Sequence, residues 1–222
     1  MDKLPFSTYD FFGYVAPGVL LVMGMEWTIS YPHVLGQDLK PFAIAAFILV
    51  VYVAGHLVAG PAKSVLEDGF VTKVLSRPSK TLFSPGRARG WRRLFPSYFA
   101  PLPAVIQERV RKRAAESGIK ETGEPLFLHA RYHEETLNNE RLMTKLDAFV
   151  GIYGFARNMA FGCLVVGLVL LTKIALGYGA VRDGTRGMLL LVAGVLLLYR
   201  YLKFFRQYSY ELFNSFGSVK EK

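Results

Sequence analysis

Long apolar runs separated by polar connections dominate the pattern of hydrophobic and polar positions along this chain. Four runs are long enough to cross the ~30 Å hydrocarbon layer of a membrane, which takes about 20 helical residues. They cover residues 11–29, 41–60, 155–176 and 188–205. The fourth run is strictly apolar only as far as Tyr199, so we expect Arg200 to reach the headgroups or to face protein. The pattern predicts an all-α integral membrane protein with four transmembrane helices in two hairpins.

The first apolar run lies where a cleaved signal peptide would lie, but two features favour a transmembrane helix instead. Pro17-Gly18 interrupts the run, and no small-x-small cleavage site precedes a polar segment. Trp27, near the end of the run, suits the aromatic belt at the headgroup level. We therefore expect a first span that Pro17-Gly18 allows to kink.

Lysine and arginine are unevenly distributed among the connections. The 61–150 connection holds 16 Lys/Arg against 10 Asp/Glu, whereas the short connections 31–40 and 178–187 hold three Lys/Arg together. Positively charged loops stay on the cytoplasmic side, so we expect the long connection and both termini in the cytoplasm. The predicted organisation is a hairpin over 1–60, a basic cytoplasmic helical domain over 61–150, a second hairpin over 151–205 and a cytoplasmic amphipathic tail over 206–222.

Composition strengthens the membrane assignment and adds a class of partners. Of the 222 residues, 52% are hydrophobic, and the mean hydropathy of +0.27 is one that a soluble domain of this length rarely reaches. The net charge of +10 predicts anionic partners such as lipid headgroups, nucleotides or nucleic acid. Cys163 is the single cysteine, which excludes an intrachain disulfide.

The long connection is predicted to be helical with an irregular, Pro- and Gly-rich middle. We expect one helix over 62–75, with Pro61 at its start, and a second over 103–117. A third helix starts near Pro125 and continues into the third span, although its apolar spacing is interrupted at Asn138-Asn139.

The tail carries an aromatic stripe at helical spacing, which continues the fourth span. Its members are Tyr201, Phe204, Phe205, Tyr208, Leu212 and Phe216. The stripe favours packing on neighbouring protein, with a position along the membrane surface as the alternative.

Four arginines surround a tryptophan in a segment of seven residues, which we call the basic segment. They are Arg87, Arg89, Arg92 and Arg93, around Trp91. One interpretation is a topology determinant that touches anionic lipid. The other is a pocket for a phosphorylated ligand, because guanidinium forks match phosphate geometry and an indole offers a stacking face for a base.

Two further clusters carry weaker signals. Arg109, Arg111, Lys112 and Arg113 spread over several faces of one helix, which favours a solvated or lipid-facing surface over a site. His129 and His133 share a helix face at a spacing that suits zinc, yet the sequence offers no convincing third ligand. We therefore expect an exposed helix face there and no metal.

Ionisable and polar residues within the spans form two groups. Glu26 and Lys173 lie near the outer ends of their spans, as a mutual ion pair or, for Glu26, as a carboxylate ring at a pore mouth. His56 and Asn158 lie toward the cytoplasmic side, with Asp10 and Arg200. Structural hydrogen bonding is the first interpretation of the second group, and gating is the alternative.

The sequence offers no positive sign of catalysis. It contains no phosphate-binding loop, nucleophile elbow, dinucleotide fingerprint or paired-cysteine motif. We therefore expect neither an enzyme nor a cofactor.

Three strings resemble the transmembrane effectors of bacterial anti-phage defence systems such as Hailong or CBASS. They are Thr8–Tyr14 with Pro17-Gly18, Gly154–Asn158 and Arg200–Tyr208. The resemblance covers spans and flanks, not the basic segment. It implies a multi-pass protein of the bacterial inner membrane, controlled by a nucleotide signal that a cytosolic partner enzyme, a nucleotidyltransferase, makes.

Together these features predict an oligomeric membrane effector. Homo-oligomers would form or gate an ion-conducting assembly in the bilayer, under control of an anionic nucleotide or oligonucleotide. A four-helix subunit has little room for its own aqueous lumen, so the conduit would lie between subunits. The alternative is a non-conducting scaffold that tethers a cytosolic partner protein, and a membrane enzyme comes third.

Overall fold

The computed structural model describes residues 11–29, 40–84 and 89–218. The chain divides into two compact units. Unit 1 comprises Met1–Glu67 and Gly154–Tyr201, and unit 2 comprises Asp68–Tyr153 and Leu202–Lys222.

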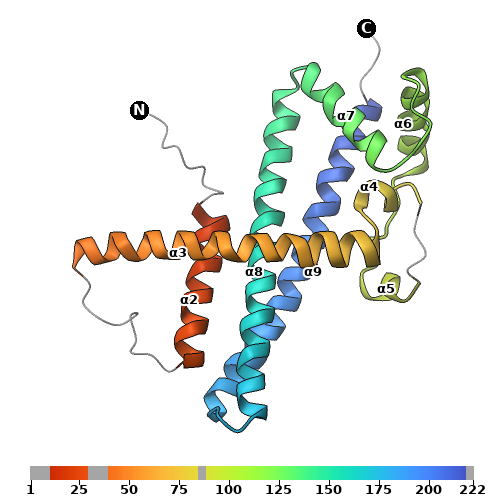
Figure 1. Cartoon of the computed structure of the whole chain (residues 1–222). Coiled ribbons are helices and arrows are strands. Elements are labelled where there is room, and N and C mark those ends of the chain that lie inside the picture. The colour runs from red at the N-terminus through yellow and green to blue at the C-terminus, as the bar shows by residue number, and fades with distance from the viewer. Residues whose placement is uncertain (1–10, 30–39, 85–88, 219–222) are drawn as a thin grey trace. The chain divides into compact units, whose positions relative to one another are not determined.

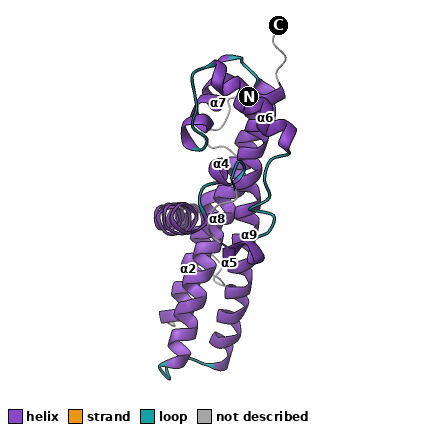
Figure 2. Ribbon diagram, turned by 90° about the vertical axis from the view of Figure 1, so that its right-hand side faces the viewer, coloured by secondary structure: helices purple, strands orange, loops and turns teal. Residues whose placement is uncertain are grey.

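All regular structure in the described residues is helical (Figures 1 and 2). Four helical stretches are long and apolar enough to cross a membrane: Phe12–Ile29, Pro41–Thr81, Glu140–Ala175 and Val181–Ser218. The predicted all-α class and the number of candidate spans are therefore confirmed.

The first two spans meet at a pair of glycines. A π-helical turn, η1 (Phe11–Val15), leads into α2 (Ala16–Ile29), and α3 (Pro41–Ala62) passes over their junction. A Cβ on Gly18 would lie 1.8 Å from the Val51 carbonyl oxygen, and one on Gly55 would lie 1.8 Å from that of Tyr14. The two backbones thus approach closely because neither glycine has a side chain.

The crossing of α2 and α3 is steep. Within unit 1, α3 lies across α2 in Figure 1 and is seen end-on in Figure 2. The connection of the predicted hairpin, residues 30–39, lies outside the described residues, so the hairpin stays a prediction. The steep crossing leaves the first half of α3 exposed, and its Phe42 is 86% exposed.

The sequence predicted that the second span ends before Pro61, but helix α3 continues past this proline. Pro61 lies inside α3, and the helix continues as the wide π-helical stretch η2 (Lys63–Leu75). Proline removes one helical N–H and crowds the preceding turn, and local π geometry is one way to accommodate it. The expected new helix over 62–75 is thus a continuation of the second span.

Helices α8 (Glu140–Ala175) and α9 (Val181–Ser218) have 36 and 38 residues. At 1.5 Å per residue they are about 54 and 57 Å long, well beyond the ~30 Å of a hydrocarbon layer. Their halves nearest the 176–180 connection belong to unit 1, and their other ends belong to unit 2. Asn138, at φ 51°, separates α8 from the preceding helix, so the predicted continuous helix from Pro125 is broken there.

Unit 2 is built from short helices around the end of α9. They are α4 (Pro78–Thr81), α5 (Arg89–Leu94), α6 (Ala104–Glu116) and α7 (Glu124–Thr136). The core includes Leu82, Leu102, Val110, Leu126, Leu146, Leu212, Phe213 and Phe216, all at most 2% exposed. The aromatic stripe of the tail therefore packs on protein, as its leading interpretation predicted.

Candidate functional site

Positive charge is concentrated in unit 2. This unit holds 19 of the 27 Lys/Arg and 11 of the 17 Asp/Glu, a net charge of +8, whereas unit 1 holds 8 and 6, a net charge of +2. Unit 2 is therefore the part of the chain that favours an anionic partner.

The basic segment is organised around Trp91. The indole lies nearly parallel to the Phe95 ring, with centroids 6.0 Å apart, and meets the edge of Phe70 at 5.3 Å. It stays 37% exposed. Trp91 thus belongs to an aromatic cluster, and Phe95 lies against one of the two faces that a base could use.

The structure describes the side chains of two of the four arginines in the basic segment. Arg87 lies outside the described residues, and Arg89 begins α5 without a described side chain. Arg92 is half-buried and Arg93 is exposed. Of the four arginines, only Arg92 and Arg93 have described side chains, and the phosphate pocket stays a prediction.

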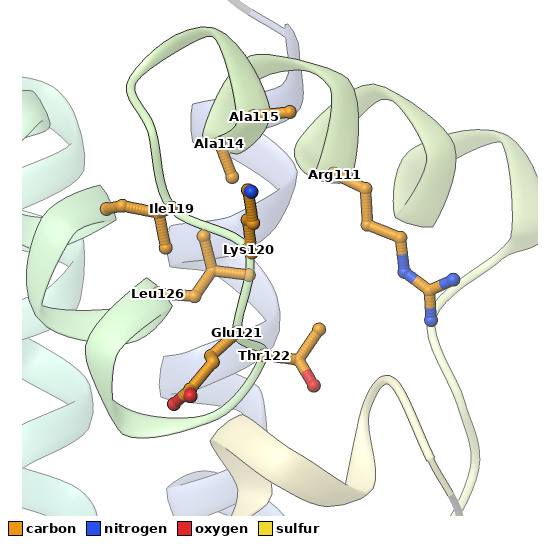
Figure 3. Close-up of a pocket in the computed structure, with 8 residues that line it drawn as sticks. All are labelled: Arg111, Ala114, Ala115, Ile119, Lys120, Glu121, Thr122 and Leu126. Carbon is orange, nitrogen blue, oxygen red and sulfur yellow. The ribbon is translucent and has the colours of Figure 1, made fainter.

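The second basic run contributes to a pocket of about 370 Å³ between α6 and α7, which we call the α6–α7 pocket. Eight residues line it: Arg111, Ala114, Ala115, Ile119, Lys120, Glu121, Thr122 and Leu126 (Figure 3). Sequence reasoning discounted Arg111 because its neighbours spread over several helix faces. The pocket depends on the loop after α6, which periodicity does not reveal.

The wall of the pocket follows from how α6 ends. Gly118, at φ +79°, takes the left-handed conformation that closes a Schellman motif. The Ile119 N–H donates to the Ala114 carbonyl at 2.8 Å, and the Gly118 N–H donates to Ala115 at 3.0 Å. This turn places Ile119 and Lys120 at the pocket. The predicted helix over 103–117 is confirmed as α6 to within one residue at each end.

His129 and His133 face protein, contrary to the exposed face that the sequence suggested. Both imidazoles lie at the edge of the Phe216 ring, with centroids 5.7 and 5.5 Å away. His133 Nε2 lies 2.9 Å from Arg113 Nη2, and Arg113 also donates to the Phe216 carbonyl at 2.9 Å. Burial lowers the pKa of His129, and nearby His133 and Arg113 lower it further. The two histidines thus secure the end of α9.

Glu134, on the same helix, is a fully buried carboxyl group. Its Oε2 accepts a hydrogen bond from Asn139 Nδ2 at 3.0 Å, and Oε1 has no hydrogen-bond partner among the described residues. No group of three or more metal-ligating side chains occurs in the described part of the chain.

Asn158 belongs to a buried polar network in unit 1. Its Nδ2 donates to the Gly13 carbonyl of the π-helical turn at 3.1 Å, and its Oδ1 accepts from Arg157 Nε at 3.3 Å. Arg157 also pairs with Glu67 at 2.5 Å, and both side chains are at most 15% exposed. Asn158 thus bonds to the π-helical turn and to Arg157, and the sequence analysis missed the Glu67–Arg157 pair.

His56 lies near this network, on α3. Its ring stacks on Tyr14 with centroids 3.8 Å apart and meets the edge of Tyr52 at 4.7 Å. The histidine itself remains exposed. Asp10, expected in the same group, lies outside the described residues.

Lys173 pairs with Asp183, not with Glu26 as the sequence suggested. Its Nζ lies 3.2 Å from Asp183 Oδ2 and donates to the Trp27 carbonyl at 2.9 Å. The Arg186 guanidinium lies 4.8 Å from the centre of the Trp27 ring. Glu26, the residue before Trp27 on α2, is buried. Lys173 therefore joins α2 to the α8–α9 hairpin.

Asp183 was missed because it was counted with a connection and lies only five residues before the predicted fourth span. In the structure it is the third residue of α9 and 8% exposed. Its position near the start of a helix, where a carboxylate is favoured, is the signal that would have found it.

No family model, curated protein or solved structure is similar enough to the chain to count as a match. Its function is therefore inferred from its own residues and their arrangement.

Proposed function

We propose that the chain is an oligomeric membrane effector in which unit 2 binds an anionic ligand and the spans form or gate an ion-conducting assembly. The observation that carries the proposal is the division of α8 and α9 between the two units. The same two helices supply candidate spans and form part of the basic unit, so a ligand that favours one packing of unit 2 would act on helices that are also candidate spans.

The charges within unit 1 support a conduit between copies. Arg157 forms an ion pair with Glu67, and Lys173 forms one with Asp183, within the same chain. These charges are paired with each other and do not line a lumen within one subunit. Exposed apolar residues cover α3 and the first half of α9, among them Leu49, Leu57, Leu189 and Leu196. Lipid or further copies of the chain would cover these surfaces.

From the resemblance to defence effectors, we propose a nucleotide or oligonucleotide made by a cytosolic partner enzyme as the ligand, and the bacterial inner membrane as the location. Both termini and unit 2 would lie in the cytoplasm, following the distribution of Lys and Arg.

A non-conducting scaffold is the second candidate. The basic unit 2 would suit a tethered protein as well as a small anionic ligand, and a scaffold needs no pore. Affinity purification in mild detergent separates the two. A stoichiometric cytosolic protein bound to chains that conduct nothing would support the scaffold.

The direct test is flux from dye-loaded vesicles that contain the purified chain. AMP, cyclic nucleotides and short oligonucleotides are added one at a time, and protein-free vesicles serve as the control. We expect at least one of these ligands to change dye release. Equal release with every ligand and with none would contradict the proposal.

A further inference from the structure

The α6–α7 pocket combines positive charge at its rim with an apolar floor. Arg111 and Lys120 supply the cations, and Thr122 supplies a hydroxyl group. Ile119 and Leu126 supply apolar surface. A ligand that uses all of these groups carries both an anionic oxygen cluster and an apolar or planar part.

The Arg111 guanidinium lies over an aromatic ring. Its central carbon lies 6.0 Å from the centre of the Phe83 ring, which is itself 6% exposed and packed against Phe213. This distance is the outer limit of a cation–π contact, and the Arg111 side chain is exposed. Its guanidinium fork can meet two oxygens of one phosphate at once.

The single acidic residue of the pocket stands away from this guanidinium. In Figure 3 the Glu121 carboxylate and the Arg111 guanidinium lie on opposite sides of the connecting loop. The Glu121 carboxylate can accept a hydrogen bond from a hydroxyl or amino group of a ligand, while the phosphate lies toward Arg111 and Lys120.

The size of the pocket limits the ligand. A volume of about 370 Å³ lies at the lower end of the roughly 300–1,000 Å³ usual for small-molecule sites. A single small phosphorylated compound fits this range, and an oligonucleotide could place only one of its residues there.

We propose that the α6–α7 pocket binds a phosphate monoester that carries an apolar or planar group, with the phosphate on Arg111 and Lys120 and the remainder on the Ile119–Leu126 floor. The inference deepens the proposed function, on which it rests, by naming the site and the chemical class of the anionic ligand. A soluble nucleotide and a lipid headgroup both offer this chemistry.

Calorimetric titration of the full chain in lipid nanodiscs tests the site. The probes are AMP, which has both parts, adenosine, which lacks the phosphate, and inorganic phosphate, which lacks the planar part. We expect saturable AMP binding that is tighter than binding of either fragment. Arg111→Ala and Lys120→Ala should each weaken AMP binding about tenfold or more, because each removes a charge-assisted contact.

Lys112→Ala is the matched control, since Lys112 is an exposed cation on the same helix outside the pocket lining. It should leave AMP affinity unchanged. Equal weakening by Lys112→Ala would show that net charge alone attracts AMP, and would overturn the site.

The lipid composition of the nanodisc distinguishes the two sources of the phosphate, a lipid headgroup and a soluble nucleotide. If phosphatidic acid in the nanodisc weakens AMP binding to the parent but not to Arg111→Ala, the pocket takes a lipid headgroup. Unchanged AMP binding assigns the pocket to a soluble ligand. Absence of saturable AMP binding, in nanodiscs with and without phosphatidic acid, would overturn the inference.

Failure of this inference and failure of the proposed function give different results. Ligand-dependent dye release that is unaffected by Arg111→Ala would remove the site and leave the effector. AMP binding at the pocket with silent vesicles would leave the site and remove the effector.

Discussion

Arg113 Nη2 and His133 Nε2 lie 2.9 Å apart and share one hydrogen bond. A guanidinium is only a donor, so Nε2 accepts this hydrogen bond. The same guanidinium donates to the Phe216 carbonyl oxygen at 2.9 Å. Arg113 therefore joins the end of α9 to the His133 imidazole of α7.

Stability of unit 2 should fall as the pH falls below about 6.5, the ordinary pKa of histidine. The lowered pKa of His129 means that the unfolded chain binds more protons than the folded chain below that pH. The contribution of His129 to the free energy of unfolding is fully present above the pKa of the unfolded state. It is lost as the pH falls toward the lower pKa of the folded state. Thermal unfolding between pH 7.5 and 5.5 measures it.

His129→Phe is the informative variant, because it keeps an aromatic ring beside Phe216 and removes one titrating group. We expect a smaller decrease in unfolding temperature on acidification than in the parent. An identical decrease in both proteins would show that His129 does not contribute.

The Glu67–Arg157 pair should matter more than an exposed pair. Glu67→Ala leaves the Arg157 charge in a buried position and should cost about 3 kcal/mol of unfolding free energy in mixed detergent micelles. Glu135→Ala breaks a pair whose side chains are both 44% exposed and should cost less than about 1 kcal/mol. Equal losses in the two variants would contradict the network assigned to Asn158.

Two glycines of α3 should respond differently to alanine. A Cβ at Gly55 would overlap the Tyr14 carbonyl, whereas one at Gly60 would meet nothing within 4 Å apart from its chain neighbours. Alanine favours a helix over glycine by about 1 kcal/mol, but a Cβ directly before Pro61 opposes this gain, so Gly60→Ala should be close to neutral. Gly55→Ala should force α3 away from the η1 turn and lower the unfolding free energy. A neutral Gly55→Ala would mean that α3 does not cross there.

The parts predicted from sequence are those that depend on local pattern. The four apolar runs fix the candidate spans by length and hydropathy, and Gly118 fixes the end of α6 by its backbone freedom. The aromatic stripe identified the face of the tail that packs, because burial follows helical spacing.

The features that the sequence did not predict depend on which segments meet in space. Estimated depth paired Lys173 with Glu26, and Asp183 was not considered because it was counted with a connection and not with a span. The steep crossing of α2 and α3 depends on the Gly18 and Gly55 contacts, which neither helix shows by itself.

The central claim is that the chain forms a conducting assembly controlled by an anionic ligand, and current through a planar bilayer tests it most directly. Purified oligomers are inserted into a lipid bilayer, and current is recorded before and after AMP, cyclic nucleotides or short oligonucleotides are added on the side of unit 2. We predict discrete current steps whose frequency or duration changes with at least one of these ligands. A bilayer that contains the protein and stays silent under every condition would contradict the claim.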